Sequence, residues 1–241
     1  MQSSEINTAS LCVTCPSRKS GFCGTLIGSA RENERTERNW QQFTAAPAGK
    51  QIANRDQIPD LVLIVCNGWA FRYFQLADGG KQILKFLLPG DILSPATFLR
   101  KAFDFSVKAL TDVRLSGFAR SEISARCGLS EDMRVSVAEA FAADAHDATE
   151  LVTVLGRRSA EERIAYLFLH LIPRIAARTV IREQRYPLPL RHQHIADAVG
   201  LTPVHVSRVL SLFRDRGIVT LSDGILAVTN FPELERIGSL K

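Results

Sequence analysis

Residues 191–230 read RHQHIADAVGLTPVHVSRVLSLFRDRGIVTLSDGILAVTN, and their pattern decides the fold of the C-terminal part of the chain. The first ten residues place apolar side chains on one helical face and end at Gly200, the usual residue type for a left-handed helix end. Thr202 suits the N-cap of a second helix, and Pro203 suits its first position because no N–H is needed there. The pattern predicts two helices joined by a tight turn.

The second of these helices is amphipathic. Apolar residues recur at i, i+3, i+4 and i+7 and predict its buried face: Val206, Val209, Leu210 and Phe213. After Gly217, two short apolar runs flank Ser222-Asp223-Gly224, which contains an Asp-Gly hairpin signal. The whole stretch therefore predicts a helix-turn-helix followed by a small β-wing.

The face opposite these apolar residues is polar, with Arg208 at its centre. In a helix-turn-helix the N-terminal part of the second helix enters the major groove, where an arginine can donate two hydrogen bonds to guanine. Val204 can meet a thymine methyl group, and Thr202 with the helix N-terminus can hold a phosphate. The predicted DNA-binding residues are Arg208, Ser207, His205, Val204, Thr202, Ser211, Arg191 and His192. The alternative is an αα corner packed within a larger domain, which explains neither the polar face nor the wing.

The segment LTPVHVSRVLSLFRDRGIV resembles the recognition helix of the CRP/FNR superfamily of bacterial transcription regulators, which has Glu-x-x-Ser-Arg in this place. Ser207 and Arg208 match that pattern. Val204 stands in place of the Glu, so the contact that Glu makes with a cytosine amino group is absent. The resemblance extends over nearly the whole chain. It implies a homodimeric, sequence-specific regulator whose partners are double-stranded DNA and RNA polymerase.

The composition allows two domains. The chain has 241 residues, of which 46% are hydrophobic, and its net charge is +5. Residues 1–155 hold 17 Lys/Arg and 17 Asp/Glu, whereas residues 156–241 hold 13 and 8, so the basic excess accompanies the predicted helix-turn-helix. No apolar run approaches the roughly 20 residues of a membrane span, and the start MQSSEINTAS has no signal-peptide core. These features predict a cytoplasmic protein that does not enter a membrane.

Three cysteines near the N-terminus, Cys12, Cys15 and Cys23, have the spacing C-x2-C-x7-C. Thiolates so spaced can wrap one metal centre, and cytoplasmic cysteines serve metal or redox sites more often than disulfides. The run resembles the cluster-binding segment of oxygen-sensing FNR-type regulators. An iron–sulfur cluster needs a fourth ligand, for which Cys66 is the first candidate and Cys127 the second. A zinc or redox-thiol site and an inherited segment without metal are the alternatives.

From Gly49 onward, short apolar runs alternate with turn signals. Asn67-Gly68, Asp78-Gly79-Gly80 and Pro89-Gly90-Asp91 separate runs such as LVLIV, WAFRYF and KQILKFLL. Closely spaced hairpins predict an antiparallel roll or barrel, and this one resembles the cyclic-nucleotide-binding β-roll of the superfamily. Residues 29–46, which precede it, predict a polar helix docked through Trp40 and Phe43.

The ligand of this roll is a separate question. Cyclic-nucleotide cassettes hold the ribose with a Gly-Glu pair and the phosphate with an Arg-Ser or Arg-Thr pair, whose arginine neutralises the anion. Neither pair is present, and Phe105 precedes Ser106 at the phosphate position. The sequence therefore argues against cyclic AMP. An apolar small molecule inside the roll, and a roll closed on its own side chains, are the two alternatives.

Residues 130–158 predict a long helix with almost no breaker. An apolar seam runs along it in steps of four and three, as a contact between two helices requires, through Phe141, Ala145, Ala148, Val152 and Leu155. The resemblance places the dimer helix here. A neighbouring stripe of Met133, Val137 and Ala140 is expected to pack on the β-roll of its own chain.

We therefore predict an α+β chain with four parts: a Cys-containing segment (1–28), a β-roll sensor (29–128), a dimerisation helix (129–158) and a winged helix-turn-helix domain (159–241). A capping box of Ser159 and Glu162 begins the last part, and Pro173 kinks or ends its first helix. No P-loop, Rossmann or triad pattern occurs, so the chain is not expected to be an enzyme. The predicted function is a transcription regulator that responds to a redox, oxygen or small-molecule signal. The rival is a small-molecule or redox-sensing module that uses the winged domain for protein contacts.

Overall fold

The computed structural model describes residues 21–28 and 41–240, and this part of the chain separates into two compact units. The first unit takes the described residues of Met1–Ala70 together with Leu87–Ala145, and the second takes Phe71–Phe86 together with the described residues of His146–Lys241. Cys12, Cys15 and most of the predicted polar helix, Trp40 included, lie outside the described residues.

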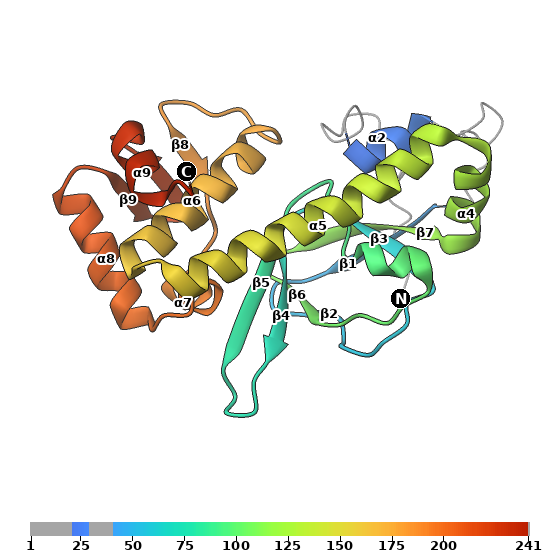
Figure 1. The fold of residues 1–241 in the computed structure, drawn as a ribbon, viewed down its shortest axis with the longest axis horizontal. Helices are drawn as coiled ribbons and strands as arrows, with labels where there is room; N and C mark the ends of the chain where they lie inside the picture. Colours follow the sequence, from blue (N-terminus) through green and yellow to red (C-terminus); the bar gives the residue numbers. More distant parts are fainter. Residues whose placement is uncertain (1–20, 29–40, 241) are drawn as a thin grey trace, which may run out of the picture. The chain divides into compact units, whose positions relative to one another are not determined.

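Antiparallel strands form the body of the first unit (Figure 1). Strand β7 (Val113–Ala119) lies between β1 (Gln41–Ala46) and β3 (Leu61–Asn67), while β2 (Gln51–Ala53) pairs with β6 (Ser106–Ala109). Gly68 turns the chain after β3 with a φ of 78°, and a Cβ atom there would lie 2.0 Å from the carbonyl oxygen of Asp112. Only glycine fits this turn without displacing the backbone.

Strand β1 shows that the predicted helix over residues 29–46 is wrong at its C-terminal end. Residues 41–46 are extended because they pair with β7, with Phe43 opposite Ser116. The side-chain amide of Gln41 also donates a hydrogen bond of 2.6 Å to the Ser116 hydroxyl. Pairing with a strand about seventy residues away decides the conformation here, as is common for strands.

Three helices share an apolar core with strands β3 and β7. They are α2 (Gly21–Gly28), α4 (Arg120–Leu129) and the N-terminal part of α5 (Glu131–Arg157). Met133 is fully buried in this core, and Val137 and Ala140 pack against it, so the predicted stripe beside the seam is confirmed. The short helix η3 (Pro95–Leu99) also contacts β3. Helix α4 has no counterpart in the sequence prediction.

The second unit begins with the hairpin of β4 (Ala70–Gln75) and β5 (Lys81–Leu87). The turn is closed by a hydrogen bond of 2.9 Å from the Leu76 N–H to the Gly80 carbonyl. The Asp78 carboxylate accepts the Gly80 N–H at 2.8 Å, a usual role for Asp in a tight turn.

Helix α6 (Ala160–Ala176) starts at the predicted capping box. The Ser159 N–H donates to the Glu162 carboxylate at 2.8 Å, and the Glu162 N–H donates back to the Ser159 hydroxyl at 3.4 Å. The first bond, with that from the Arg158 guanidinium, lowers the pKa of Glu162 to about 2. Pro173 lies inside the helix and does not end it: the helix continues to Ala176, and the Ala177 N–H donates to the Pro173 carbonyl at 3.0 Å.

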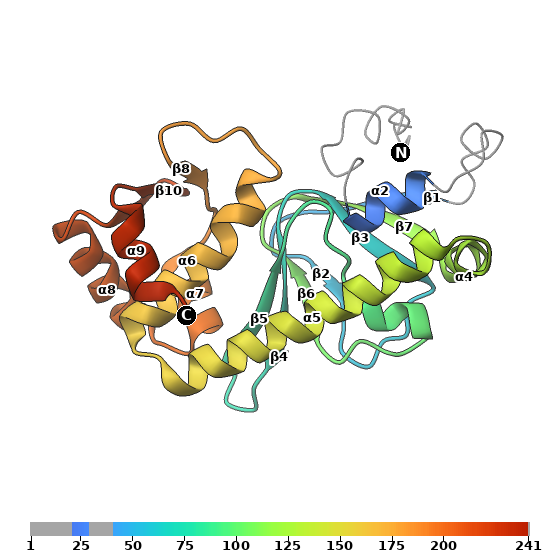
Figure 2. The same cartoon turned by 45° about the horizontal axis from the view of Figure 1, so that its top comes forward.

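The remainder of the second unit forms the predicted winged helix-turn-helix, which is confirmed. In the chain, helices α7 (His192–Val199) and α8 (Pro203–Asp215) lie between β8 (Arg185–Pro187) and β9 (Val219–Ser222). Strand β10 (Ile225–Val228) pairs with both β8 and β9 in one sheet. Helix α9 (Phe231–Gly238), capped by Asn230, lies beside α6 (Figure 2). Among the helices of the described residues, none is long and apolar enough to cross a membrane.

Candidate nucleic-acid interface

The turn between α7 and α8 is built by local chemistry. Gly200 ends α7 with a φ of 64°, the left-handed conformation that favours glycine. The Thr202 hydroxyl accepts the His205 N–H at 3.2 Å and so caps α8. The predicted helix end and N-cap are both confirmed.

Helix α8 has one buried and one exposed face. Val206, Val209, Leu210 and Phe213 are buried, as predicted from their spacing. The opposite face is open to solvent: Val204 is 61% exposed, and His205, Ser207 and Arg208 are exposed as well. Ser211, one turn further along, is half-buried. The helix thus presents a row of exposed side chains opposite its buried face.

Arg208 differs from the other arginines near α8 in its contacts. Within the described residues, its side chain makes no hydrogen bond or ion pair. The Arg216 guanidinium is bound by Glu161 at 3.2 Å and by Glu233 at 2.8 Å, and Arg214 lies 3.4 Å from Asp215. Arg208 is therefore the cation on α8 whose donors are all available for an external acceptor.

Two further predicted DNA-binding residues, Arg191 and His192, lie at the start of α7 and are exposed. The Arg191 N–H donates to Nδ1 of His194 at 3.1 Å, which satisfies one of the unpaired donors at this helix N-terminus.

The turn of the β-wing follows α8 in the chain. Asp223 and Gly224 have φ values of 51° and 72°, and the positive φ of both is what a type I′ hairpin turn requires.

Two residues that support this interface carry no signal in the sequence. The side-chain amide of Gln82, on β5, donates to the Ala198 carbonyl at 3.1 Å. The Arg163 guanidinium, on α6, donates to the Val199 carbonyl at 3.2 Å. Both carbonyls belong to the last turn of α7. The partners are 116 and 36 residues apart in sequence, so no local pattern could have revealed them.

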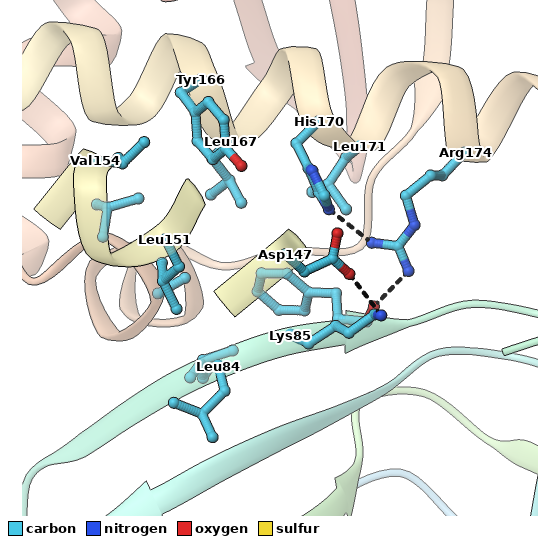
Figure 3. Close-up of a pocket in the computed structure, with 14 residues that line it drawn as sticks. Leu84, Lys85, Asp147, Leu151, Val154, Tyr166, Leu167, His170, Leu171 and Arg174 are labelled. Atoms are coloured by element: carbon cyan, nitrogen blue, oxygen red, sulfur yellow. Dashed lines mark hydrogen bonds and ion pairs between the residues drawn. The ribbon is translucent and has the colours of Figure 1, made fainter. Parts of the chain in front are cut away.

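A small cavity of about 40 Å³ lies behind the helix-turn-helix, lined by β5, α5, α6 and α7 (Figure 3). It has room for about one water molecule. Its apolar wall includes Ile83, Leu151 and Val154, and a polar cluster closes one end. In this cluster the Lys85 ammonium lies 2.5 Å from the Asp147 carboxylate, with side chains only 14% and 22% exposed.

Helix α6 supplies the other half of the polar cluster. The Arg174 guanidinium donates to the Phe86 carbonyl at 2.8 Å and contacts His170 (Figure 3). Burial lowers the pKa of His170, and the Arg174 charge adds to this effect. The Tyr166 hydroxyl donates to Glu150 at 2.7 Å, and burial together with this carboxylate raises the pKa of Tyr166.

The predicted sensor residues lie in the first unit. Phe105 is buried, and its ring centre lies 6.1 Å from that of Phe103. Cys23, Cys66 and Cys127 are half-buried and form no disulfide among the described residues. Within residues 21–28 and 41–240, no three His, Cys, Asp or Glu side chains gather into a set that could hold a metal ion.

A winged helix-turn-helix with an exposed polar face on its second helix defines the chain as a DNA-binding transcription regulator. The family model of the Crp-like helix-turn-helix domain matches residues 162–237, and that of the cyclic nucleotide-binding domain matches residues 44–127. The transcriptional activatory protein AadR of Rhodopseudomonas palustris is 32% identical over 212 residues, which cover 88% of this chain and 86% of that protein. The chain belongs to the CRP/FNR family of transcription regulators, whose members are not enzymes.

A second relative agrees with this assignment, and one solved structure has the same fold. The nitrogen fixation regulation protein FixK of Azorhizobium caulinodans is 31% identical over 171 residues, which cover 71% of this chain and 68% of that protein. The structure of FixK2 from Bradyrhizobium japonicum has a TM-score of 0.75 at 24% identity and covers 83% of this chain and 98% of that one. The fold class predicted from the sequence, a cyclic-nucleotide-binding-like β-roll with a C-terminal helix-turn-helix, is confirmed.

Proposed function

We propose that α8 is the recognition helix and that Arg208 reads a guanine in the major groove. The observation that carries this proposal is the exposed face of Val204, His205, Ser207 and Arg208, in which the Arg208 donors have no acceptor within the described residues. An arginine in this position can donate to O6 and N7 of one guanine. Arg191, His192 and Thr202 would hold the flanking phosphates, and Ser211 would lie at the edge of the contact.

Titration with random duplex DNA at several salt concentrations tests this function against the rival one. Each phosphate contact releases counterions, so the logarithm of the affinity should fall steeply and linearly with the logarithm of the salt concentration. Selection from a random duplex library would then supply a preferred site. A protein that used the winged domain only for protein contacts would show neither the salt-dependent binding nor a selected sequence.

We also infer a homodimer formed through α5. Of the predicted seam, Ala145 and Ala148 are exposed, Val152 is 72% exposed and Leu155 is half-buried. The ring of Phe141 lies 6.3 Å from that of Phe98 in the same unit, so this residue supports its own fold. The exposed stripe continues from Ala145 in steps of three and four through Ala142, Ala138 and Val135. Apolar residues in steps of three and four support a seam between two copies of the helix.

The N-terminal thiols are proposed to sense redox state or oxygen. When bound, an iron–sulfur cluster would supply one-electron chemistry to this segment. Cys127, rather than Cys66, packs against the apolar core that contains Phe22 and Leu26 of α2, the helix that carries Cys23. Burial raises the pKa of the Cys127 thiol, and Arg134 opposes this effect, so ligation would release a proton. We therefore propose Cys12, Cys15, Cys23 and Cys127 as the ligand set, with Cys66 as the alternative fourth ligand.

The fourth ligand can be tested by comparing iron content and the visible absorption spectrum of anaerobically purified variants. Cys127→Ala should lose iron while Cys66→Ala retains it. The reverse result would restore Cys66 as the ligand. Zinc without iron in every sample would favour the zinc alternative, and a protein without either metal would favour a thiol switch or an inherited segment.

The β-roll is proposed to respond to a signal other than cyclic AMP. Phe105, buried against Phe103, occupies the place where a phosphate-binding arginine would be needed.

We keep the division of the chain by role as a proposal: a Cys-containing segment (1–28), a sensor (29–128), a dimerisation helix (129–158) and a DNA-binding domain (159–241). Because its relatives include a protein named as a transcriptional activator, contact with RNA polymerase is proposed as well.

A further inference from the structure

The C-terminal end of α7 is held by side chains from two other elements. The last carbonyls of a helix have no partner within it and need one from outside. Here Gln82 of β5 donates to the Ala198 carbonyl at 3.1 Å, and Arg163 of α6 donates to the Val199 carbonyl at 3.2 Å. The Ala196 carbonyl accepts the Leu201 N–H of the turn at 3.1 Å. The end of α7 is thus fixed from both sides at the point where the chain turns.

This point lies immediately before α8. Gly200 follows Val199 in the left-handed conformation, and Thr202 already caps α8. A Cβ atom on Gly200 would lie at ordinary contact distances, 3.5 Å from Leu155 and 3.6 Å from the Arg163 guanidinium. Only three residues, 200–202, separate the Ala198 and Val199 carbonyls from α8. A displacement of these carbonyls would therefore also displace the start of α8.

Strand β5 is itself anchored in the second unit. Beyond Gln82, the Ile83 side chain is 1% exposed and lines the small cavity together with Ala198 and Val199. Lys85 then pairs with Asp147 of α5 at 2.5 Å, and the Phe86 carbonyl accepts from Arg174 of α6 at 2.8 Å (Figure 3). Contacts at three successive places hold the strand, so it can act as a fixed support.

The neighbouring strand of the hairpin contacts the other end of α7. The ring of Phe71, on β4, lies 6.0 Å from that of His194, and Phe71 is buried. Nδ1 of His194 accepts the Arg191 N–H at 3.1 Å. The hairpin therefore contacts both ends of the first helix of the helix-turn-helix.

We propose that β5 positions the recognition helix, and that Gln82 is the positioning residue that acts through the Ala198 carbonyl. The hairpin lies within residues 44–127, which match the cyclic nucleotide-binding domain, yet it belongs to the same compact unit as the helix-turn-helix. With β5 held in this way, the Gln82 contact would fix the position of the turn before α8. This inference rests on the proposed docking of α8 in DNA.

The test compares Gln82→Ala with Gln75→Ala in the full chain. Gln75 lies on the same hairpin and has the same side chain, but it donates to Gly79 and Gly80 at the hairpin turn. In the DNA-free protein, hydrogen exchange of the backbone amides of residues 200–206 should be roughly two- to ten-fold faster in Gln82→Ala, the effect of losing the one hydrogen bond that Gln82 makes to α7. The second bond of the Gln82 amide, to the Ile83 carbonyl at 2.9 Å, lies within β5. Affinity for a duplex selected on the wild type should fall by a similar factor, whereas affinity for random duplex and the Gln75→Ala protein should be unchanged.

Two more variants test the chemistry of the contact. Gln82→Lys keeps a donor and places a positive charge at a helix C-terminus, where it is favoured, so it should restore slow exchange. Gln82→Glu places a carboxylate, which cannot donate and is repelled, beside the Ala198 carbonyl. Exchange of the turn amides should therefore be faster in Gln82→Glu than in Gln82→Ala. Equal behaviour of the Lys and Glu variants would overturn the proposal, as would turn amides in Gln82→Ala that exchange at the wild-type rate.

The remaining outcomes separate positioning from general stability. If exchange in Gln82→Ala accelerated throughout the second unit and both duplexes lost affinity equally, Gln82 would be merely structural and the inference would be wrong. Faster exchange confined to the turn with unchanged preference for the selected duplex would also overturn it. Failure of the docking proposal shows differently, because Arg208→Ala would then leave binding of the selected duplex unchanged.

Discussion

The Arg174 guanidinium lies 3.2 Å from Nε2 of His170, one turn earlier on the same helix. At this distance the His170 nitrogen serves as an acceptor, so the ring is neutral in the folded protein. Tyr166 of α6 stacks on it, and the charged groups facing it are Asp147 and Glu150 of α5, Lys85 of β5 and Arg174 itself.

This arrangement predicts a loss of stability on acidification. Burial lowers the pKa of His170 below its ordinary 6.5, so the unfolded chain takes up a proton more readily than the folded one. The contribution of neutral His170 to the free energy of unfolding is fully present above pH 6.5. It is lost as the pH falls from 6.5 through the lowered pKa of His170. Chemical denaturation between about pH 8 and about pH 5 should show this loss in the wild type and not in His170→Gln, whose amide oxygen accepts at any pH.

The matched control is His146→Gln, because His146 is an exposed histidine of the same unit that lies 3.4 Å from Glu150. It should keep the wild-type response. Carboxylates such as Glu162 titrate below the pH range of this experiment. Because the pKa of Glu162 is lowered from its ordinary 4.5, the contribution of Glu162 to stability falls only below pH 4.5. An equal acid response in wild type and His170→Gln would assign the effect to another group.

For DNA recognition, Arg208→Ala should weaken binding to a selected duplex by about 1 to 3 kcal/mol and relax the preferred base at one position. Arg214→Ala is the control, since Arg214 lies on the same helix beside Asp215. Thr202→Ala should weaken all duplexes alike and lower the free energy of unfolding by about 1 kcal/mol through loss of the cap. Fluorescence titrations with selected and random duplexes measure all three variants. Unchanged affinity and base preference in Arg208→Ala would reject the docking.

The dimer prediction concerns one exposed side chain of α5. Val152→Glu should dissociate the homodimer, because it would bring two carboxylates together in an apolar seam. Val180→Glu is the control, since Val180 is 82% exposed but lies outside α5. Light scattering at micromolar concentration distinguishes the states, and the variant Cys12→Ser, Cys15→Ser, Cys23→Ser should remain a dimer. A monomeric triple variant would show instead that assembly depends on the thiols.

Packing of α9 on α6 predicts a defined cost at one glycine. A Cβ atom on Gly238 would lie 2.7 Å from backbone atoms of Ala165 and Tyr166, so Gly238→Ala should destabilise the protein by about 1 to 3 kcal/mol. Gly128→Ala provides the comparison, because nothing lies within 4 Å of the added methyl group on α4. It should be neutral or stabilising by up to about 1 kcal/mol. Equal midpoints of thermal unfolding in both variants would contradict this packing.

The ligand prediction is that cyclic AMP does not bind the β-roll. Buried Phe105 offers no charge to neutralise a phosphate, and the acid that would hold the ribose is missing. Titration calorimetry of the full chain should show no heat of specific binding. A dissociation constant in the low micromolar range would show that other residues hold the nucleotide.

The sequence by itself determined the helix-turn-helix because its signals are local. The spacing of Val206, Val209, Leu210 and Phe213 defines a buried face within four turns of helix, and the Thr202 cap joins atoms three residues apart. Gly200 and the Asp223-Gly224 turn can also be predicted locally, since a left-handed backbone favours particular residue types wherever it occurs. The resemblance to a known family then supplied the class of function.

Only the tertiary structure decided which distant segments meet. Residues 41–46 became strand β1 because β7 pairs with them, against the helix predicted for that stretch. Cys127, not Cys66, packs with the core that includes α2, and Gln82 reaches a carbonyl 116 residues away. No repeating pattern in the sequence marks such contacts. The number of residues between two distant segments does not say whether they meet in space. They form only when the surrounding apolar faces, such as that of Ile83, are buried together and bring the polar groups within reach.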